Sequence, residues 1–311
     1  MRITQNMMTN TVVQNLQTNL NELNTLNDQI ASGKNFSVPS DNPLGVLDSM
    51  QLTDAVNANT QYIQNANQGM SLLNSADGSL GNLTTIINRV NDLAVQGASD
   101  TLTTQDRMSI AQEVAQLQGQ VMSIANTDVA GNYIFAGTNN NTPPMTSTTS
   151  GATTTYTWSG NSNPAIPSTQ ISYQIGANTN LQVNVDGSSI FGTTAPTGAT
   201  SSLMQTMTNL ISDLQSGNGQ QISSRDIGDI QANLDNVLQV RTDIGARVNR
   251  IQSMQNTLTG QNTNLQELLS NVQNVDLAQA ITQMESQKET YTASLQASAQ
   301  ILQPTLLQFL S

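Results

Sequence analysis

The chain has 311 residues, of which 36% are hydrophobic and 3% aromatic, a composition that is poor for one large globular core. It contains no cysteine and no histidine, which excludes disulfides, thiolate nucleophiles, histidine general bases and the commonest transition-metal ligands. The net charge of −12 argues against a nucleic-acid partner, because such a partner needs a basic surface.

Membrane and targeting signals follow from the distribution of apolar residues. No apolar run approaches the length of a membrane span, so we expect no membrane insertion. Residues 1–6 lack the apolar centre of a cleaved signal peptide. The protein is therefore expected to be cytoplasmic, or to leave the cell by a route that uses no cleaved signal.

The N-terminal residues 1–31 predict an amphipathic helix with a heptad repeat. Thr and Asn are frequent in its first turns and are mediocre helix formers, so the helix should need a partner to order it. Gly33 is a good C-terminal cap, and the segment from Pro39 to Pro43 reads as an irregular connection. The apolar seam positions of this helix are Val13, Leu16, Leu20, Leu23 and Ile30.

Two further helices are predicted before residue 128. One begins after Pro43, a residue that suits the first turn of a helix, and ends near Gln96 because Gly97 follows. The next covers 105–127, with Thr103 or Thr104 as its N-terminal cap.

The period changes to that of strands at Gly131. Residues 132–137 form a short segment with aromatic and β-branched side chains, which predicts a strand. The segment from there to about Ser202 is dense in Thr, Ser, Asn, Gly and Pro. Aromatic residues that alternate with Thr and Gln favour a small β domain, with a low-complexity linker as the alternative. The further strand candidates are Thr153–Trp158, Gln170–Ile175, Leu181–Val185 and Ser189–Phe191.

The strongest periodic pattern runs from Ser224 to Val272 and contains no proline. Its 3.5-residue repeat indicates a long helix in a coiled coil or an extended bundle, roughly 70 Å long at 1.5 Å per residue. A shorter helical segment, Leu203–Leu214, precedes it. The seam positions of the long helix are Ile227, Ile230, Leu234, Val237, Arg241, Ile244, Val248, Ile251, Gln255, Leu258, Asn262, Leu265, Leu269 and Val272.

The last segment keeps heptad spacing almost to the C-terminus, and Pro304 is expected to loosen its final turns. Its seam includes Leu277, Ile281, Met284, Tyr291, Leu295, Ser298, Leu302, Leu306 and Phe309. Because this seam has no obvious partner inside the chain, deletion of 301–311 should leave a helical monomer that cannot assemble.

These elements predict a mainly α fold: a long antiparallel helical coiled-coil rod made by both chain ends, with a small central β-rich domain. We expect a terminal helix at 1–45 that forms the assembly region with 276–311. The two halves of the helical rod are expected at 46–137 and 203–275. The β-rich outer domain is expected at 138–202, and excision of 140–200 should spare the helices.

Five short stretches near the two chain ends resemble motifs of the flagellin superfamily. They are Met1–Thr4, Ala31–Pro43, Asp243–Arg250, Val275–Thr282 and Ser294–Ala299. The motif residues of interest are Ser32, Gly33, Ser40, Asp41, Pro43, Tyr133, Phe135, Gly137, Gly245, Arg247, Asn249, Arg250 and Asp276. The resemblance covers roughly 1–137 and 201–311, and residues 140–200 carry none.

Within the superfamily, the chain is more similar to the hook–filament junction group than to the filament-forming flagellins. The segment 132–138 resembles the junction group's Tyr-x-Phe-x-Gly element, and Ser40–Pro43 resembles its Ser-Asp-x-Pro. The resemblance implies a secreted structural subunit, exported unfolded by the flagellar type III apparatus with an export chaperone. It implies a homo-oligomeric ring between the first hook-associated protein and flagellin, with no enzymatic activity and no cofactor.

Candidate chemical sites are few and weak. Ser32 and Lys34 flank a helix-ending glycine and lack an oxyanion hole. Asp226 and Asp229 lie three residues apart, where a solvated helix face is the simpler interpretation than a cation site.

The arginines Arg241, Arg247 and Arg250 suggest structural pairing with Asp235 and Asp243 rather than an anion site. Arg241 lies at a seam position and could fix the register of the helix. Two other functions stay open at this point: a filament-forming flagellin, and a secreted adhesin whose β domain binds a host ligand on a helical stalk.

Overall fold

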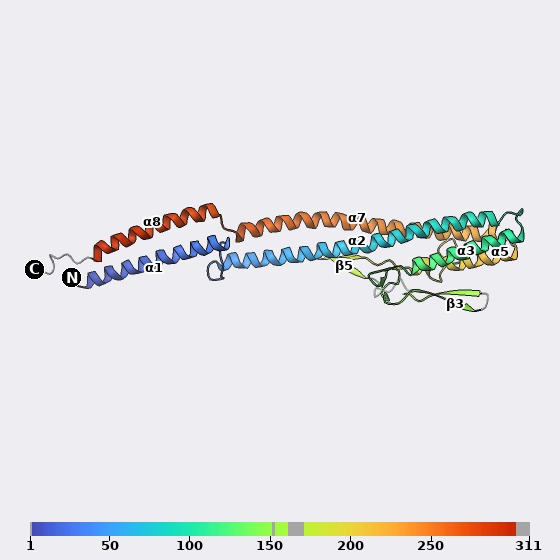
Figure 1. The fold of residues 1–311 in the computed structure, drawn as a ribbon, viewed down its shortest axis with the longest axis horizontal. Coiled ribbons are helices and arrows are strands. Elements are labelled where there is room, and N and C mark those ends of the chain that lie inside the picture. The colour runs from blue at the N-terminus through green and yellow to red at the C-terminus, as the bar shows by residue number, and fades with distance from the viewer. Residues whose placement is uncertain (1, 151–152, 161–170, 303–311) are drawn as a thin grey trace, which may run out of the picture. The chain divides into compact units, whose positions relative to one another are not determined.

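The computed structural model describes residues 2–150, 153–160 and 171–302, and it is mainly helical (Figure 1). The helices are α1 Arg2–Ser32, α2 Pro43–Gly97, α3 Thr104–Ala125, α4 Ser188–Phe191, α5 Leu203–Ser216, α6 Gly219–Gln221, the π-helical turn η2 Ile222–Asp226, α7 Ile227–Gln273 and α8 Leu277–Leu302. The strands are β1 Asp128–Val129, β2 Asn132–Tyr133, β3 Met145–Ser150, β4 Thr153–Trp158, β5 Ser172–Gly176 and β6 Thr179–Gln182. The predicted mainly α fold with a small β-rich part is confirmed.

The chain forms two compact units. Unit 1 combines Met1–Asn59 with Gly260–Ser311, and unit 2 is Thr60–Thr259. The two longest helices, α2 and α7, each contribute to both units. In the part of the chain that the structure describes, no helix is long and apolar enough to cross a membrane.

In unit 2, α2 and α7 run antiparallel, as their side-chain pairs show. Asn67 Oδ1 accepts a hydrogen bond from Gln255 Nε2 at 2.7 Å, and Asp77 Oδ1 accepts one from Arg241 Nε at 2.9 Å. The heptad of α7 is visible in its burial, since every seventh side chain is buried while the alternate seam positions are half-buried. The buried positions are Ile230, Val237, Ile244, Ile251 and Leu258.

Helices α3 and α5 complete the helical part of unit 2. Thr103 caps α3, because its Oγ1 accepts from the amide of Asp106 while the Asp106 carboxylate accepts from the Thr103 amide. Gln118 on α3 donates to Met204 O of α5 at 3.1 Å. Helix α5 ends at Gly217, whose φ of 79° is the left-handed conformation that glycine adopts readily.

The strands form three separate antiparallel hairpins. The β3–β4 hairpin pairs Met145 with Trp158 and runs through a Thr- and Ser-rich register. The β1–β2 hairpin turns through Ala130 and Gly131, whose φ values of 54° and 81° are both positive. Two successive positive φ angles are typical of a type I′ turn, which suits glycine better than alanine.

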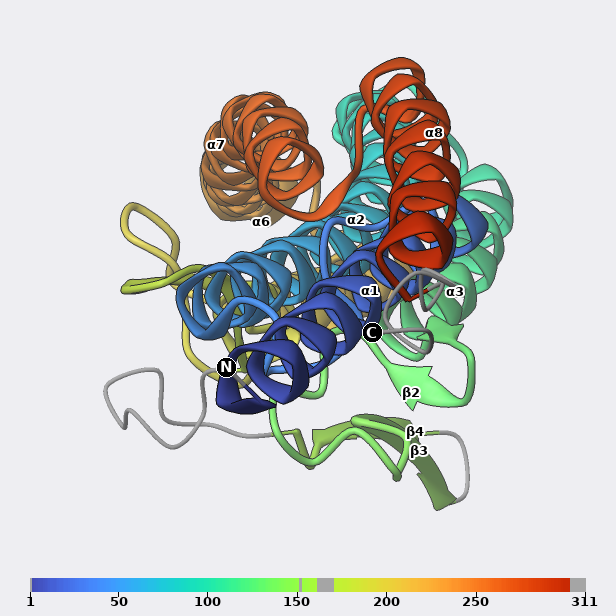
Figure 2. The same cartoon turned by 90° about the vertical axis from the view of Figure 1, so that its left-hand side faces the viewer.

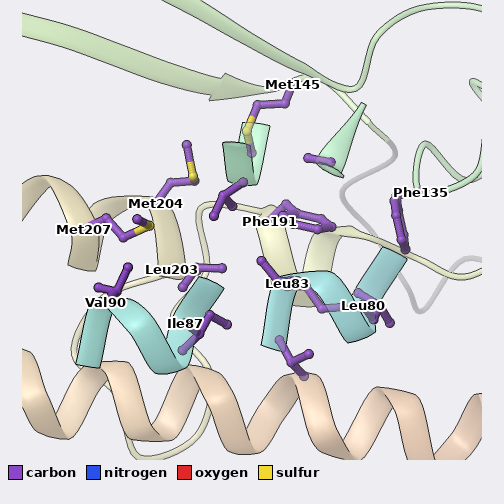
Figure 3. Close-up of a cluster of buried hydrophobic side chains, with 14 of the residues drawn as sticks. Leu80, Leu83, Ile87, Val90, Phe135, Met145, Phe191, Leu203, Met204 and Met207 are labelled. Atoms are coloured by element: carbon purple, nitrogen blue, oxygen red, sulfur yellow. The ribbon is translucent and has the colours of Figure 1, made fainter. Parts of the chain in front are cut away.

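One apolar core joins the helices and the β-rich segment of unit 2 (Figure 3). Phe135 is fully buried and meets Phe191 edge to face, with ring centroids 5.3 Å apart. Met145 and Ile175, from two different hairpins, belong to the same buried cluster as Leu80 of α2. This segment supplies part of the core of the helices, so the shared core argues against the expectation that 140–200 can be excised without harm to them, and that expectation stays a prediction to be tested.

Several predictions in the β-rich segment need correction. The strand predicted at Leu181–Val185 ends at Gln182 and begins earlier, at Thr179. Ser189–Phe191 is helical instead of extended, because Asp186 Oδ1 accepts from the Ser188 amide at 2.9 Å and starts a helical turn. Only Asn132 and Tyr133 of 132–137 form a strand, since the backbone turns before Gly137, where φ is 69°. The strand Met145–Ser150 was not predicted, because the five residues after Met145 are all Thr or Ser and carry no apolar–polar alternation.

In unit 1, α1 and α8 lie side by side and antiparallel (Figures 1 and 2). Asn19 Nδ2 donates to Ser294 Oγ at 3.5 Å, and Gln287 of α8 donates to both Asn19 and Glu22. The beginning of α1 therefore lies beside the end of α8.

Candidate assembly surface

Two chain connections in unit 1 are hydrogen-bonded to each other. Lys34 and Asn274 form an antiparallel bridge, and Asn35 N donates to Gln273 O at 2.8 Å. Val275 N donates to Gly33 O at 3.1 Å. We call residues 33–35 and 273–275 the clasp, because together they join the end of α1 to the start of α8.

Gly33 makes the clasp possible through its backbone conformation. Its φ is 69°, and its amide closes α1 by donating to Gln29 O at 2.8 Å. Ser32 Oγ accepts from the Lys34 amide at 3.3 Å, so the imagined Ser32–Lys34 pair is a turn contact. The predicted helix end is confirmed, and the Gly33 carbonyl accepts the hydrogen bond from Val275 across the clasp.

The remaining motif residues of this region either begin a helix or hold the turn that precedes one. Asn42 Oδ1 accepts from the Gly45 amide at 3.0 Å, and Pro43 is the first residue of α2. Asp41 Oδ2 accepts from the amides of Ser37 and Val38, which holds the turn that contains Ser40. Asp276 Oδ1 accepts from Ala278 N at 3.0 Å and Gln279 N at 3.2 Å, so this aspartate caps α8.

The α1–α8 interface uses only part of the predicted seam. On α1, Leu16, Leu23 and Ile30 are half-buried, whereas Val13 and Leu20 are each 44% exposed. On α8 the covered positions are mostly small or polar, and Leu295 is 43% exposed. The covered α8 positions are Ala280, Met284, Gln287, Tyr291, Ser294 and Ser298.

Unit 1 consequently leaves much of its apolar surface uncovered. Among its described residues, Phe36 and Ala280 are the buried apolar side chains. Most of the strongly exposed large apolar side chains of the described chain lie in this unit, and Leu44 is the extreme case at 74%. We call them the uncovered apolar set: Met7, Val13, Leu20, Val38, Leu44, Leu47, Met50, Leu268, Leu277, Ile281 and Leu295.

The C-terminal members of the predicted seam are only partly within the described chain. Leu302 is the last residue of α8, and Leu306 and Phe309 lie outside the described residues. The role of these three residues in assembly stays a prediction, as does the effect of deleting 301–311.

A second group of motif residues acts inside unit 2. Arg247 on α7 pairs with Asp243 at 2.6 Å and also donates to the carbonyls of Gln182 and Asn184 at 3.4 Å. It thereby ties the β5–β6 hairpin to α7. The Phe135 carbonyl accepts from the Gly187 amide at 3.1 Å.

The same motif also contributes residues to the outer surface of α7. Gly245, Asn249 and Arg250 lie on its exposed face, and open space surrounds the position that a Cβ of Gly245 would occupy. No contact among the described residues explains this glycine.

The acidic residues near the start of α7 are buried, so the expected solvated face is wrong. Asp229 accepts from the amide and hydroxyl of Thr200 at 2.7 and 2.6 Å. Asp226 is fully buried, pairs with Arg225 at 2.9 Å, and has a second oxygen without a hydrogen-bond partner. Burial raises the pKa of Asp226 to about 6, although the nearby Arg225 guanidinium opposes the shift. Within the described residues, no group of acidic side chains could hold a metal ion.

The predicted arginine pairs are half correct. Arg247 pairs with Asp243 as expected, but Arg241 pairs with Asp77 of α2. The contact with α2 raises the pKa of Arg241, because the charged guanidinium is hydrogen-bonded to a carboxylate. A seam arginine that bonds to the facing helix fits a role in fixing register.

Sequence reasoning missed the polar residues that join segments distant in the chain. Asn35 Nδ2 donates to Asn274 O at 2.8 Å in the clasp. Asn126, which follows the end of α3, exchanges two hydrogen bonds with the Met145 backbone at 2.8 and 2.9 Å. An asparagine just after a helix end is the available signal, but it does not say which strand the side chain will meet.

Family models match both arms of the chain. The bacterial flagellin N-terminal helical region matches residues 3–140, and the bacterial flagellin C-terminal helical region matches residues 227–310. The chain belongs to the bacterial flagellin family. The two matches contain the clasp, the helix caps and the uncovered apolar set of this flagellin-family chain.

Relatives of this flagellin-family chain fall into two groups. A flagellin of Clostridium tyrobutyricum is 34% identical over 127 residues, 41% of this chain and 34% of the relative. Flagellar hook-associated protein 3 of Escherichia coli is 24% identical over 288 residues, 87% of both chains. The chain thus spans about a third of that flagellin's length, but most of the length of the hook-associated protein.

Solved structures show the same fold. The structure of a putative flagellar hook-associated protein from Vibrio parahaemolyticus superposes with a TM-score of 0.64 at 22% identity. The match covers 75% of this chain and the whole of that one.

Proposed function

We propose that this chain is a structural subunit of the bacterial flagellum that joins the hook to the flagellin filament, and that it has no enzymatic activity. The observation that supports an assembly role is the uncovered apolar set of unit 1. The same unit buries almost no apolar side chains of its own. Large apolar side chains that gather on an exposed surface are typical of a protein–protein interaction site. The match to hook-associated protein 3 over 87% of both chains supports the junction over the filament.

Assembly would bury the uncovered apolar set between neighbouring subunits. Full burial of one Leu or Phe side chain contributes on the order of 1.5–3 kcal/mol, so a few such residues are enough to decide whether subunits associate. The assembly region of the proposal is 1–45 with 276–311, the helical rod is 46–137 with 203–275, and the outer domain is 138–202. Loosely packed terminal helices that become ordered on assembly fit this arrangement.

The partners in this proposal are other copies of the chain in a ring, the first hook-associated protein on the hook side and flagellin on the filament side. The subunit would reach this extracellular site unfolded, through the flagellar type III export apparatus and with the help of an export chaperone. A unit with few buried contacts costs little to unfold, which suits such export.

Immunogold electron microscopy of intact flagella tests the location, with antibody against residues 140–200. We expect label in one band between hook and filament. A strain that lacks the gene should secrete flagellin into the medium without filaments, and expression of the full chain should restore them. Absence of label from flagella, with secretion verified, would contradict the proposal.

A filament-forming flagellin is the second candidate. The observation in its favour is the 34% identity to the Clostridium tyrobutyricum flagellin. Label along the whole filament in the same experiment would establish this function in place of the junction.

A further inference from the structure

Unit 2 contains a cavity of about 300 Å³ that the junction role does not use. It lies between α2, the β1–β2 hairpin with the turn that follows it, and the β5–β6 hairpin. Its size is at the lower end of the range for small-molecule sites, which is enough for one or two sugar rings.

The side chains that line the cavity are all uncharged. No Asp, Glu, Lys or Arg is among the residues that form the cavity, although the chain as a whole has a net charge of −12. A buried charged group on a ligand would find no partner here and would lose its hydration without compensation. The occupant should therefore be uncharged.

The chemical groups of the lining are aromatic rings, amides and aliphatic side chains. Tyr133 and Tyr173 supply the rings, and Leu72 and Val183 supply apolar surface. Amide side chains, which both donate and accept hydrogen bonds, come from all three walls: Gln68, Asn132, Asn140 and Asn184. A sugar ring matches this set, because its C–H face stacks on aromatic rings and its hydroxyl groups exchange hydrogen bonds with amides.

Contacts within the chain hold two walls of the cavity. Gly69 of α2 leaves room for Val183 and Tyr173, since a Cβ at this position would lie 2.8 Å and 3.6 Å from their side-chain atoms. Asn184 Oδ1 accepts from the Ile171 amide at 3.0 Å, which orients its side chain. Ala130, in its left-handed conformation, forms part of the rim.

We propose that this cavity binds an uncharged mono- or disaccharide. The ring of Tyr133 or Tyr173 would stack on the apolar face of the sugar, and the amides of Gln68, Asn132 and Asn140 would bind its hydroxyl groups. This gives the junction subunit a recognition site for glycans that is separate from its assembly surface.

Saturation-transfer difference NMR on the full chain as a monomer tests the proposal. The probes are glucose, galactose, N-acetylglucosamine, maltose and N,N′-diacetylchitobiose at millimolar concentration, with glucuronic acid and glucose 6-phosphate as charged counterparts. We expect transfer to at least one neutral sugar and weaker transfer to the charged ones.

Three variants locate the binding. Gln68→Ala removes one exposed amide and should weaken binding about three- to tenfold, the range for one neutral hydrogen bond. Ser71→Phe should fill the mouth of the cavity and abolish transfer. Gln116→Ala, an exposed glutamine on α3 away from the cavity, should leave affinity unchanged.

Several results would overturn the proposal. These are absence of transfer to every neutral sugar, equal transfer to the charged sugars, or binding that Gln68→Ala leaves unchanged. An extended uncharged peptide that binds where sugars do not would assign the cavity to a protein segment and also overturn it. Because the experiment uses the monomer, its outcome is independent of the flagellar location.

Discussion

Asp226 is the residue whose environment departs furthest from that of an ordinary side chain. It is fully buried at the end of the π-helical turn η2, with Arg225 at 2.9 Å and one oxygen unpartnered. Asp213 also pairs with Arg225, so one guanidinium serves two carboxylates, and the charge of Asp229 is close by. Burial outweighs the pairing with Arg225, so the pKa of Asp226 lies above that of an exposed aspartate.

This environment predicts a pH-dependent stability. The pKa of Asp226 is about 6 in the folded chain and near 3.8 in the unfolded one. Because the folded value is the higher, the contribution of Asp226 to the free energy of unfolding is greatest below pH 4 and is lost as the pH rises through 6, a fall on the order of 3 kcal/mol. Urea denaturation followed by circular dichroism at several pH values should show this fall in the wild type and a flatter profile in Asp226→Asn. Asp235→Asn changes an exposed carboxylate on the following helix, α7, and should keep the wild-type profile.

Ala130 predicts a stabilising substitution. Its φ of 54° in the two-residue β1–β2 turn costs roughly 1–2 kcal/mol for an alanine, whereas asparagine tolerates this conformation in type I′ turns. Ala130→Asn should raise the free energy of unfolding by about 1 kcal/mol, measured by urea denaturation. Ala177→Asn, in the β5–β6 turn, provides the matched control. A destabilised Ala130→Asn variant would show that the turn is not the source of strain.

At the scale of elements, the periodic pattern predicted which segments are helices but not which helix face meets which partner. The seam of α7 was read correctly, since a strict heptad without proline leaves one possible apolar stripe. In α1, Leu20 and Leu23 both fit the predicted seam, yet Leu23 is half-buried and Leu20 is exposed. Two adjacent stripes on one helix satisfy the same spacing, so sequence alone does not divide them between partners.

The two stripes of α1 and α8 predict separable effects on folding and assembly. Leu20→Ser with Leu295→Ser changes exposed positions and should alter the stability of the monomer by less than about 0.5 kcal/mol. The same pair removes apolar surface from the proposed subunit contact, so it should abolish motility in a complementation assay. Gln17→Ser, at an exposed polar position of α1, should support normal motility. Full motility of the double variant would remove these residues from the assembly surface.

Short elements in the β-rich segment were predicted less well than the helices. Thr153–Trp158 was found in full because Tyr156 and Trp158 alternate with threonines. Its partner Met145–Ser150 has no aromatic residue and becomes a strand through pairing, and Ser188–Phe191 becomes a helix because of one aspartate side chain. Among the site residues, the helix caps at Gly33, Pro43 and Asp276 follow local rules, whereas the clasp depends on a contact between residues 34 and 274 that no local rule predicts.

At the scale of the whole molecule, the shared core of unit 2 predicts that the β-rich segment is indispensable. Replacement of 140–200 by a short linker would remove Met145, Ile175 and Phe191 from the core and expose the side chains of α2 and α5 that they cover. Loss of each buried large side chain costs roughly 2–5 kcal/mol, so three together exceed much of the stability of a typical domain. Thermal denaturation followed by circular dichroism should show that the cooperative transition is lost or strongly lowered. A transition like that of the full chain would show that the helices are self-sufficient.

The clasp has a consequence for the order in which the chain folds. Its two strands are separated by more than two hundred residues, so closing it in an otherwise unfolded chain carries a large loop-closure entropy. Once unit 2 has formed, Asn67 and Gln255 are already in contact, and the loop that remains to be closed is short. Unit 2 should therefore fold first. In a chain that is synthesised or exported from its N-terminus, α1 is the first helix to emerge and must wait for α8, one of the last, before it can pair.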